Sequence, residues 1–356
     1  MKKLKTEYRN YESNYVNKYS HCALVKDYTT TRCNRAKLDT GTFCNYDCEF
    51  CYYQGELHIK TDFETIQKRI DMLHDYGITE VDLSGGESSV HKDWFKILKY
   101  CNSRFSNIST LTNGRKFSNE DFLIKSKEHG LKEILFSVHG YDETSHDEIV
   151  RRKGGWKNIM KAIELSHKHN IIVRINCTVY QRNIEGLLSY HEIIKPLKPL
   201  EVNFLTLNYW VNNEHADPIN YKRATDNIKT CIDNLKSHVK YINVRYTPYC
   251  YMKGYEKHVC NQFQHIYDRF DWNKEIYDYN IDVSRTYTNQ EKIDMAYSAA
   301  AEPRLKDYVK PVECLGCKYY NICDGVEKQV TDCKVYPEPG EKITDVNHYR
   351  HGFYNE

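Results

Sequence analysis

Short apolar runs alternate with longer amphipathic stretches between residues 36 and 207, and each pair of them predicts a β-strand followed by a helix. The predicted strands cover 36–42, 80–84, 108–112, 133–139, 171–179 and 201–207, and the predicted helices cover 63–77, 93–105, 119–129, 156–169 and 184–194. Right-handed crossovers between such units build a parallel sheet or barrel. The pattern therefore predicts an α/β fold with its site in the loops after the strands.

The alternation ends after Leu207, where polar and aromatic residues dominate, helical patterning returns around 219–239 and a cysteine-rich segment follows. A chain of 356 residues is long enough for one large domain and a smaller appended unit. We therefore predict an N-terminal extension over 1–30, a core domain over 31–210 and a C-terminal region over 211–356.

Charge and hydropathy exclude several classes of partner. The chain has 51 Lys and Arg against 49 Asp and Glu, a net charge of +2, which creates no field that would gather nucleic acid. The basic start, MKKLKTEYRN, is followed by no apolar run of signal-peptide length, and no stretch approaches the length of a membrane span. These features predict a cytoplasmic protein without a membrane or nucleic-acid partner.

Fourteen cysteines in a chain without an export signal, gathered toward both ends, favour metal or cluster ligation over disulfides. Cys44, Cys48 and Cys51 follow the first predicted strand, with no fourth cysteine beside them. Three thiolates can hold three irons of a 4Fe-4S cluster and leave the fourth iron open for a ligand. The alternative is a zinc site completed by His58 or by another cysteine.

A second cysteine group, Cys314, Cys317 and Cys323 with the later Cys333, supplies four thiols and predicts a closed site. Paired CxxC knuckles are common zinc ligands, so a zinc ribbon is one interpretation of this group. Because the second half of the group is not a CxxC, an auxiliary iron–sulfur cluster is the interpretation that we favour.

The spacing Cys-x3-Cys-x2-Cys, with aromatic Phe50 before the third cysteine, resembles the radical S-adenosylmethionine (SAM) superfamily. Gly85, Gly86 and Glu87 in LSGGE are similar to the superfamily's GGE motif, whose glycines we expect to leave space for SAM. Ser88 stands where the superfamily often has proline, a departure that we expect to loosen the turn. The resemblance implies a partial (β/α)6 barrel and a SAM-binding 4Fe-4S cluster. It also implies a 5′-deoxyadenosyl radical and a flavodoxin- or ferredoxin-type reductant.

The same resemblance implies SAM contacts from Ser137, Arg152 and Asn176, although Arg152 has an equal claim to a solvated loop. Cys177 is a candidate hydrogen donor to a substrate radical. Neighbouring residues of a strand face opposite ways, so at most one of Asn176 and Cys177 can serve the site. For His139 we expect an ordinary core or surface position.

The C-terminal cysteines are similar to the SPASM or twitch extensions of radical SAM enzymes. Glu327 stands where the SPASM pattern has another cysteine, and Cys250 and Cys260 resemble its upstream pair. We therefore predict one auxiliary 4Fe-4S cluster held by Cys314, Cys317, Cys323 and Cys333.

The resemblance implies an enzyme that abstracts hydrogen from a C–H bond and oxidises, crosslinks or epimerises a ribosomal peptide. The 30 N-terminal residues are short for a leader-binding domain, which counts against a peptide and keeps open a dehydrogenase or epimerase of a sugar or other small metabolite. A non-enzymatic alternative is an iron–sulfur electron-transfer protein or a zinc-stabilised binding protein.

Overall fold

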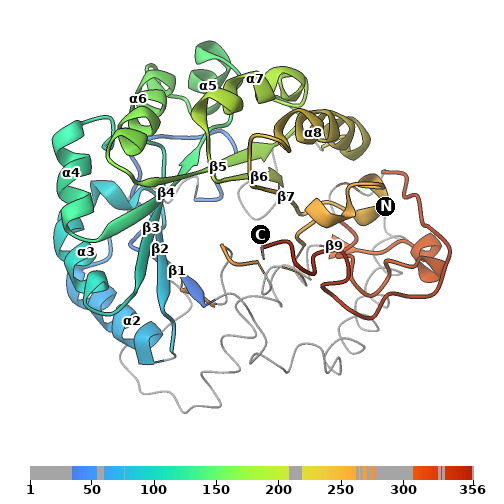
Figure 1. Cartoon of the computed structure of the whole chain (residues 1–356), viewed down its shortest axis with the longest axis horizontal. Helices are drawn as coiled ribbons and strands as arrows, with labels where there is room; N and C mark the ends of the chain where they lie inside the picture. Colours follow the sequence, from blue (N-terminus) through green and yellow to red (C-terminus); the bar gives the residue numbers. More distant parts are fainter. Residues whose placement is uncertain are drawn as a thin grey trace, which may run out of the picture.

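The computed structural model describes residues 34–53, 60–75, 77–207, 219–261, 264, 268–270, 274–276, 308–327, 330 and 333–354. One curved sheet of eight parallel strands dominates it, in the order β7-β6-β5-β4-β3-β2-β1-β8 (Figure 1). The strands are β1 (Arg35–Asp39), β2 (Glu80–Ser84), β3 (Asn107–Thr112), β4 (Leu131–Ser137), β5 (Ile172–Val179), β6 (Glu201–Thr206), β7 (Tyr241–Arg245) and β8 (Lys274–Ile276).

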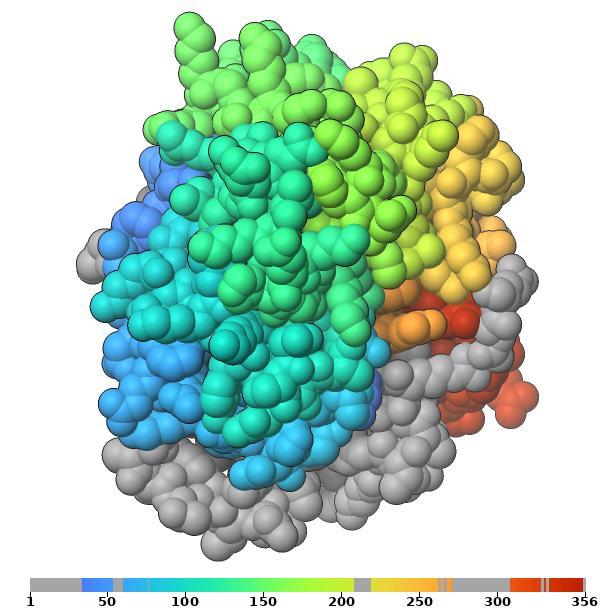
Figure 2. All heavy atoms as spheres, turned by 60° about the vertical axis from the view of Figure 1, so that its left-hand side comes forward, coloured from blue at the N-terminus to red at the C-terminus, as the bar shows by residue number. Residues whose placement is uncertain are grey.

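Helices cover the convex face of this sheet (Figure 1). They are α2 (Phe63–Asp75), α3 (Trp94–Asn102), α4 (Glu120–Glu128), α5 (Glu143–Ile149), α6 (Gly155–Lys168), α7 (Leu187–Leu197) and α8 (Tyr221–Leu235). Figure 2 shows the segments coloured blue to green packed into a continuous surface on this side, with C-terminal segments at its edge. Among the described residues, no helix is both long and apolar enough to span a bilayer.

The core lies between the sheet and these helices. In α2 the buried residues Ile66, Ile70 and Leu73 recur at helical spacing and meet the outward-facing Ala36 and Leu38 of β1 in one apolar cluster. Burial of this stripe stabilises α2, because a helix of 13 residues is marginal in isolation.

The C-terminal region is mostly irregular. It contains the short helices η4 (Tyr249–Tyr251), η5 (Glu256–His258) and η7 (Val312–Gly316), and an antiparallel pair, β9 (Tyr308–Val309) and β10 (Val326–Glu327). Figure 1 shows these segments beside the β7 end of the sheet.

All six predicted strands and all five predicted helices are confirmed, with shifts of a few residues at their ends. The predicted α/β half-barrel is confirmed as well. After the predicted sixth strand the chain adds α8, then β7 beside β6 at one edge of the sheet and β8 beside β1 at the other. The predicted boundary near residue 210 lies outside the described residues, so the domain division stays a prediction.

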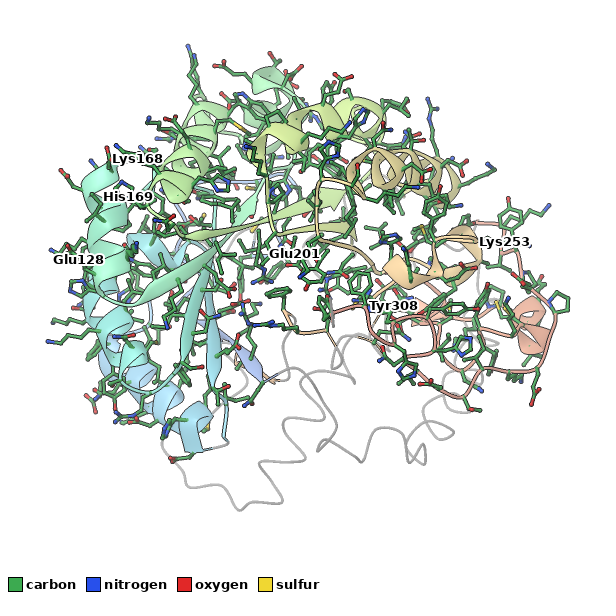
Figure 3. The ribbon with its side chains drawn as sticks, in the orientation of Figure 1. Glu128, Lys168, His169, Glu201, Lys253 and Tyr308 are labelled. Carbon is green, nitrogen blue, oxygen red and sulfur yellow. The ribbon has the colours of Figure 1, made fainter. Side chains whose placement is uncertain are left out.

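Inside the curve of the sheet, the first halves of the strands carry a buried network of charges. Arg35 lies 2.7 Å from Asp82 and 3.0 Å from Glu133, and Arg174 lies 2.7 Å from Glu201. Figure 3 shows Glu201 inside the curve, whereas Glu128, Lys168 and His169 lie at the outer helices. Buried ions persist only when paired, so these contacts bind β1, β2, β4, β5 and β6 to one another.

Segments from the end of the chain complete this network. The guanidinium of Arg174 donates to the carbonyl of Phe270 at 3.0 Å. Arg350 donates to the Asn243 side chain at 2.9 Å and lies 3.5 Å from Asp268. The C-terminal residues therefore close the end of the half-barrel at which the strands begin.

Candidate active site

The opposite end of the half-barrel, where the strands finish, contains a cavity of about 290 Å³. Nine predicted site residues line it: Cys44, Cys48, Phe50, Cys51, Gly85, Gly86, Glu87, Ser137 and Asn176. They come from the loops after β1 and β2 and from the ends of β4 and β5. The structure thus brings most of the predicted site together where parallel α/β folds build their sites.

The cysteine loop is held in place by α5, a helix that the sequence pattern did not reveal. The Glu49 amide donates to the Ile149 carbonyl at 3.0 Å, at the end of α5. Arg182 donates to Glu49 at 2.7 Å and to Glu148 of α5 at 3.1 Å. These bonds fix the middle of the loop between its second and third cysteines.

Gly85 and Gly86 allow the cysteine loop to lie directly against the end of β2. A Cβ on Gly85 would lie 2.1 Å from the Gly41 carbonyl oxygen, and one on Gly86 would lie 2.1 Å from that of Thr42. Gly85 also has φ +117°, which favours glycine. The loop backbone thus fills the space that a Cβ would take, while both glycines also line the cavity, and their role in leaving space for SAM stays a prediction.

Ser88 ties this turn, contrary to the expectation that it loosens it. Its hydroxyl donates to the Ser84 carbonyl at 2.6 Å and accepts from the Thr40 hydroxyl at 2.9 Å. The hydroxyl therefore cross-links the ends of β1 and β2 where the superfamily often has a proline.

Glu87 is buried, and its carboxylate accepts hydrogen bonds from three donors. The Ser89 hydroxyl makes a short bond to it, and the Thr112 hydroxyl and the Asn113 amide donate to it at 2.8 Å each. Burial raises the pKa of Glu87, and these donors oppose that shift. The Asn113 side chain in turn donates to Asn45 of the cysteine loop at 2.8 Å, so Glu87 and the loop form one unit.

The three cysteines of the loop are half-buried in the cavity wall. Burial is the main cause that raises the pKa of Cys44 to about 12, and it also raises the pKa values of Cys48 and Cys51. Iron binding must therefore displace protons from these thiols. Three soft donors on one wall of the cavity fit three corners of a 4Fe-4S cluster.

A zinc ion would hold its thiolates close together, since Zn–S bonds of about 2.3 Å imply S···S distances of about 3.8 Å. Among the described residues, no group of three or more Cys, His, Asp or Glu side chains is arranged to hold a single metal ion. His58, the alternative fourth ligand, lies outside the described residues.

His139 lines the cavity, although the sequence interpretation placed it in the core or on the surface. Its Nδ1 accepts from the Thr178 amide at 3.1 Å, and its ring meets Phe50 edge-on at 4.6 Å. Burial lowers its pKa well below the usual value, and His146 lowers it further. His139 is therefore a neutral imidazole with its proton on Nε2. The signal was present: His139 lies two residues after Ser137, the spacing of one strand face.

Cys177 and Arg152 are not brought to the cavity. Cys177 is fully buried on the other face of β5, where its thiol contacts Tyr190 of α7, and burial raises its pKa to about 12. Asn176 takes the cavity side of the strand, so the suggestion that Cys177 donates hydrogen there is corrected. Arg152 is exposed, and its amide bonds the Asp147 carbonyl at 2.9 Å, in agreement with the solvated-loop alternative.

Sequence reasoning missed several cavity residues that carry no motif. Lys37 of β1 is one of them; its Nζ lies 3.2 Å from the Tyr52 hydroxyl and 3.6 Å from Asp39. Tyr246, just after β7, has φ +60°, a strained conformation for an aromatic residue. Only the alternation of polar residues along β1 could have pointed to Lys37.

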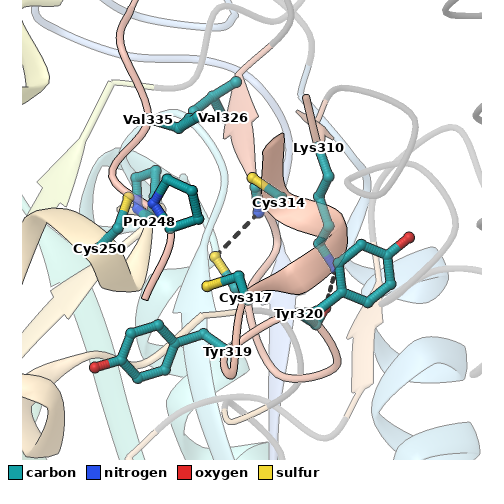
Figure 4. A pocket seen from close by; sticks show the side chains of 12 residues that line it. Pro248, Cys250, Lys310, Cys314, Cys317, Tyr319, Tyr320, Val326 and Val335 are labelled. Carbon is teal, nitrogen blue, oxygen red and sulfur yellow. Dashed lines mark hydrogen bonds between the residues drawn. The ribbon is translucent and has the colours of Figure 1, made fainter. Parts of the chain in front are cut away.

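The second cysteine group lies around a separate, smaller pocket (Figure 4). Cys314, Cys317 and Cys323 line it as predicted, and Cys250 joins them, whereas Cys333 is absent from its wall. Burial raises the pKa values of Cys250 and Cys314 to about 12.

Comparisons with known proteins agree with this geometry. Residues 38–187 match the Radical SAM superfamily. The chain is 26% identical over 226 residues to the antilisterial bacteriocin subtilosin biosynthesis protein AlbA of Bacillus subtilis (strain 168), covering 63% of this chain and 45% of AlbA. It is 30% identical over 148 residues to the sporulation killing factor maturation protein SkfB of the same strain, covering 40% of this chain and 35% of SkfB. The chain thus spans less than half the length of either relative.

Among solved structures, native anSMEcpe with bound AdoMet and Kp18Cys peptide superimposes with a TM-score of 0.57 at 16% identity, covering 90% of this chain and 96% of that one. This likeness concerns the fold, and it extends through the C-terminal region. The sequence match makes residues 38–187 similar to the Radical SAM superfamily, and the structural likeness shows that the fold is shared as well.

Proposed function

We propose that the chain is a radical SAM enzyme that abstracts hydrogen from a C–H bond of a ribosomally made peptide and thereby oxidises, crosslinks or epimerises it. The observation that carries the proposal is the cavity in which Cys44, Cys48 and Cys51 meet the GGE turn and the polar ends of β4 and β5. The names of AlbA and SkfB, which concern bacteriocin biosynthesis and killing-factor maturation, support a peptide as the substrate.

Cys44, Cys48 and Cys51 would hold the 4Fe-4S cluster, which together with SAM and an electron from a flavodoxin- or ferredoxin-type protein supplies the 5′-deoxyadenosyl radical. The protein's own residues hold the reacting groups in fixed positions. The bonds from Glu49 to Ile149 and from Asn113 to Asn45 keep the cysteine loop at a fixed place on the cavity wall. Fixed placement of reacting groups is worth several kcal/mol of barrier, about 7–11 at best.

The ends of β4 and β5 offer polar groups for SAM. Ser137 and Asn176 face the cavity and present a hydroxyl and an amide, which suit a carboxylate or a ribose. Neutral His139, with its proton on Nε2, adds a donor whose direction is set by the bond from Thr178 to Nδ1. Because these groups are fixed before SAM arrives, little ordering is needed on binding.

The rest of the cavity wall suits a peptide. Thr178 of β5, and Thr206 and Leu207 at the end of β6, line it beside Tyr246. Hydroxyl groups and strand-end backbone can bond to a peptide main chain, while Leu207 and Tyr246 offer apolar contact. Enclosure by these residues keeps water from a reactive carbon radical.

The test is anaerobic reconstitution of the protein with iron and sulfide, followed by SAM and dithionite. We expect 5′-deoxyadenosine in the wild type and in Cys101→Ala, whose cysteine is buried in α3 away from the cavity. We expect none in Cys48→Ala. Absence of 5′-deoxyadenosine from the fully loaded wild type would refute the proposed chemistry.

The substrate is tested with peptides encoded by short reading frames beside the coding sequence, synthesised in deuterated form. Hydrogen abstraction from such a peptide transfers deuterium to 5′-deoxyadenosine, and the modified peptide shows its own mass change or inverted stereocentre. Deuterium transfer from a small metabolite but from none of these peptides would overturn the peptide proposal while leaving SAM cleavage intact.

A further inference from the structure

We propose that the auxiliary iron–sulfur site is completed by Cys250, so that Cys250, Cys314, Cys317 and Cys323 are its four ligands and Cys333 is not one. The proposal rests on the proposed function only in that the second site holds a cluster. It replaces the ligand that sequence order favours with one that lies 64 residues before Cys314.

The four thiols enclose one pocket from two parts of the chain. Cys250 lies in η4, shortly after β7, and Cys314 lies in η7, with Cys317 directly after that helix. Figure 4 shows Cys250 across the pocket from Cys314 and Lys310. Thiols on opposite walls of a small apolar pocket can reach different corners of one cube, whereas a contiguous loop such as that of Cys44–Cys51 leaves one corner open.

Backbone bonds hold the three C-terminal thiols in place. The Cys317 amide donates to the Cys314 carbonyl at 2.9 Å, and the Cys323 amide donates to the Tyr319 carbonyl at 2.9 Å. The Gly325 amide lies 3.4 Å from the Cys323 sulfur, as expected of a donor to a ligating thiolate.

The segment that carries Cys250 is fixed to these thiols by aromatic packing. The ring of Tyr249 stacks on that of Tyr319 with centroids 5.2 Å apart and planes at 16°. Both tyrosines are fully or almost fully buried. Because Tyr249 is next to Cys250 and Tyr319 lies between Cys317 and Cys323, the stack sets the distance across the pocket.

Cys333 and Cys260 do not line this pocket, although Cys333 lies near enough to Cys250 to raise the pKa of its thiol. The pocket wall on the side of Cys333 is formed by Val335 and Pro337, and the Cys333 thiol contacts the Tyr251 hydroxyl. The Cys260 sulfur lies 3.4 Å from Arg245, within the charge network that closes the half-barrel. Neither thiol lines the pocket that the other four share.

A buried cation fits the charge of such a site. Lys310 lines the pocket, is 3% exposed and donates from Nζ to the Tyr320 carbonyl at 2.5 Å. Its charge attracts Cys314, Cys317 and Cys323. Four thiolates around a cluster carry excess negative charge, and burying that charge is favourable only with a compensating cation nearby.

The test uses the full-length chain carrying Cys44→Ala, Cys48→Ala and Cys51→Ala together, so that only the second site can hold a cluster. After anaerobic reconstitution, we expect about four irons and four sulfides per chain, with the absorption and reduced-state EPR of a 4Fe-4S cluster. Adding Cys250→Ala should reduce bound iron to a quarter or less, or leave a three-iron cluster recognisable by EPR. Adding Cys333→Ala, the matched control, should leave the iron content and spectra unchanged.

Loss of the cluster in the Cys333→Ala background, or its retention with unchanged spectra in the Cys250→Ala background, would overturn the proposal, as would one zinc per chain in place of iron. Alkylation of the wild type covers the case of an unfolded variant: in loaded protein Cys333 should react while Cys250 is protected, and chelation should release Cys250. Protection of Cys333 with reaction of Cys250 would refute the assignment. None of these measurements requires SAM cleavage, so a failure here is distinct from a failure of the proposed function.

Discussion

Gly86→Ala should separate the cysteine loop from the sheet and abolish cluster binding at the first site. The added Cβ would lie 2.1 Å from the Thr42 oxygen and 2.3 Å from the Phe43 oxygen. Both contacts are with backbone, which cannot turn away as a flexible side chain does. The loop must therefore move by about 1 Å, the difference from an ordinary carbon–oxygen contact of about 3.3 Å.

The cost follows from the bonds at this junction. The Gly86 amide donates to the Gly41 carbonyl at 2.9 Å, and the Glu87 amide donates to the Phe43 carbonyl at 2.8 Å. A buried donor or acceptor left unpaired costs about 1–3 kcal/mol. Loss of both bonds should lower the free energy of unfolding by about 2–6 kcal/mol, and a shifted loop no longer presents three thiols to one cluster.

The measurement is urea unfolding of the apoprotein together with iron content after reconstitution. Gly77→Ala is the control: Gly77 has φ +81° but nothing within 4 Å of the added Cβ. Its cost is conformational only, about 1–2 kcal/mol, and its iron content should match the wild type. If Gly86→Ala unfolds no more easily than Gly77→Ala and binds a full complement of iron, the inferred backbone contact is wrong.

Three further outcomes are expected. Glu87→Gln places an NH₂ group against donors, so it should destabilise the fold by about 1–3 kcal/mol and weaken SAM binding, measured by urea unfolding and calorimetry. Arg182→Met removes the ion pairs of Arg182 with Glu49 and Glu148; the Arg182 side chain is 47% exposed. The free energy of unfolding should therefore change by less than about 1 kcal/mol, while a chelator should extract the first cluster several-fold faster. Burial lowers the pKa of His146 to about 4, so the unfolded chain takes up a proton that the folded chain refuses. Stability should fall by roughly 3 kcal/mol as the pH decreases from about 6.5 to about 4, with a shallower slope in His146→Asn; equal slopes would contradict this reasoning.

The sequence predicts those parts of the fold that depend on local patterns. The strand EVDLS is confirmed at its exact bounds: Val81 and Leu83 alternate with polar residues, and glycines stand on either side of the strand. The short helix α5 escapes prediction because its sequence, ETSHDEI, has one apolar residue and is stabilised by a capping box between Asp142 and Ser145. Its role in holding the cysteine loop arises from contacts between residues more than 90 positions apart, which sequence periodicity cannot predict.

The candidate site likewise has one part that the sequence predicts and one that it does not. Cysteine spacing and the GGE triplet locate the first site, because one loop and one turn carry the chemistry. In the second group, sequence order pairs Cys333 with its neighbours, whereas the wall of the pocket contains Cys250. Side-chain packing between distant segments, here the stack of Tyr249 on Tyr319, determines that outcome.

On the inner face of the half-barrel, residues that stabilise the fold lie near the start of the strands, and residues that line the cavity lie near their ends. In β1 the inward residues run from Arg35, paired with buried carboxylates, to Lys37 at the cavity wall. In β5 they run from Arg174, paired with Glu201, to Asn176 and Thr178 in the cavity. Charges at the first end of the strands are satisfied by one another, whereas Lys37, Asn176 and Thr178 line the cavity at the other end. The C-terminal segment supplies Arg350 to the charged end of the strands, and Cys250, shortly after β7, lines the second cysteine pocket, so side chains of the C-terminal region contribute both to the charge network and to the second site.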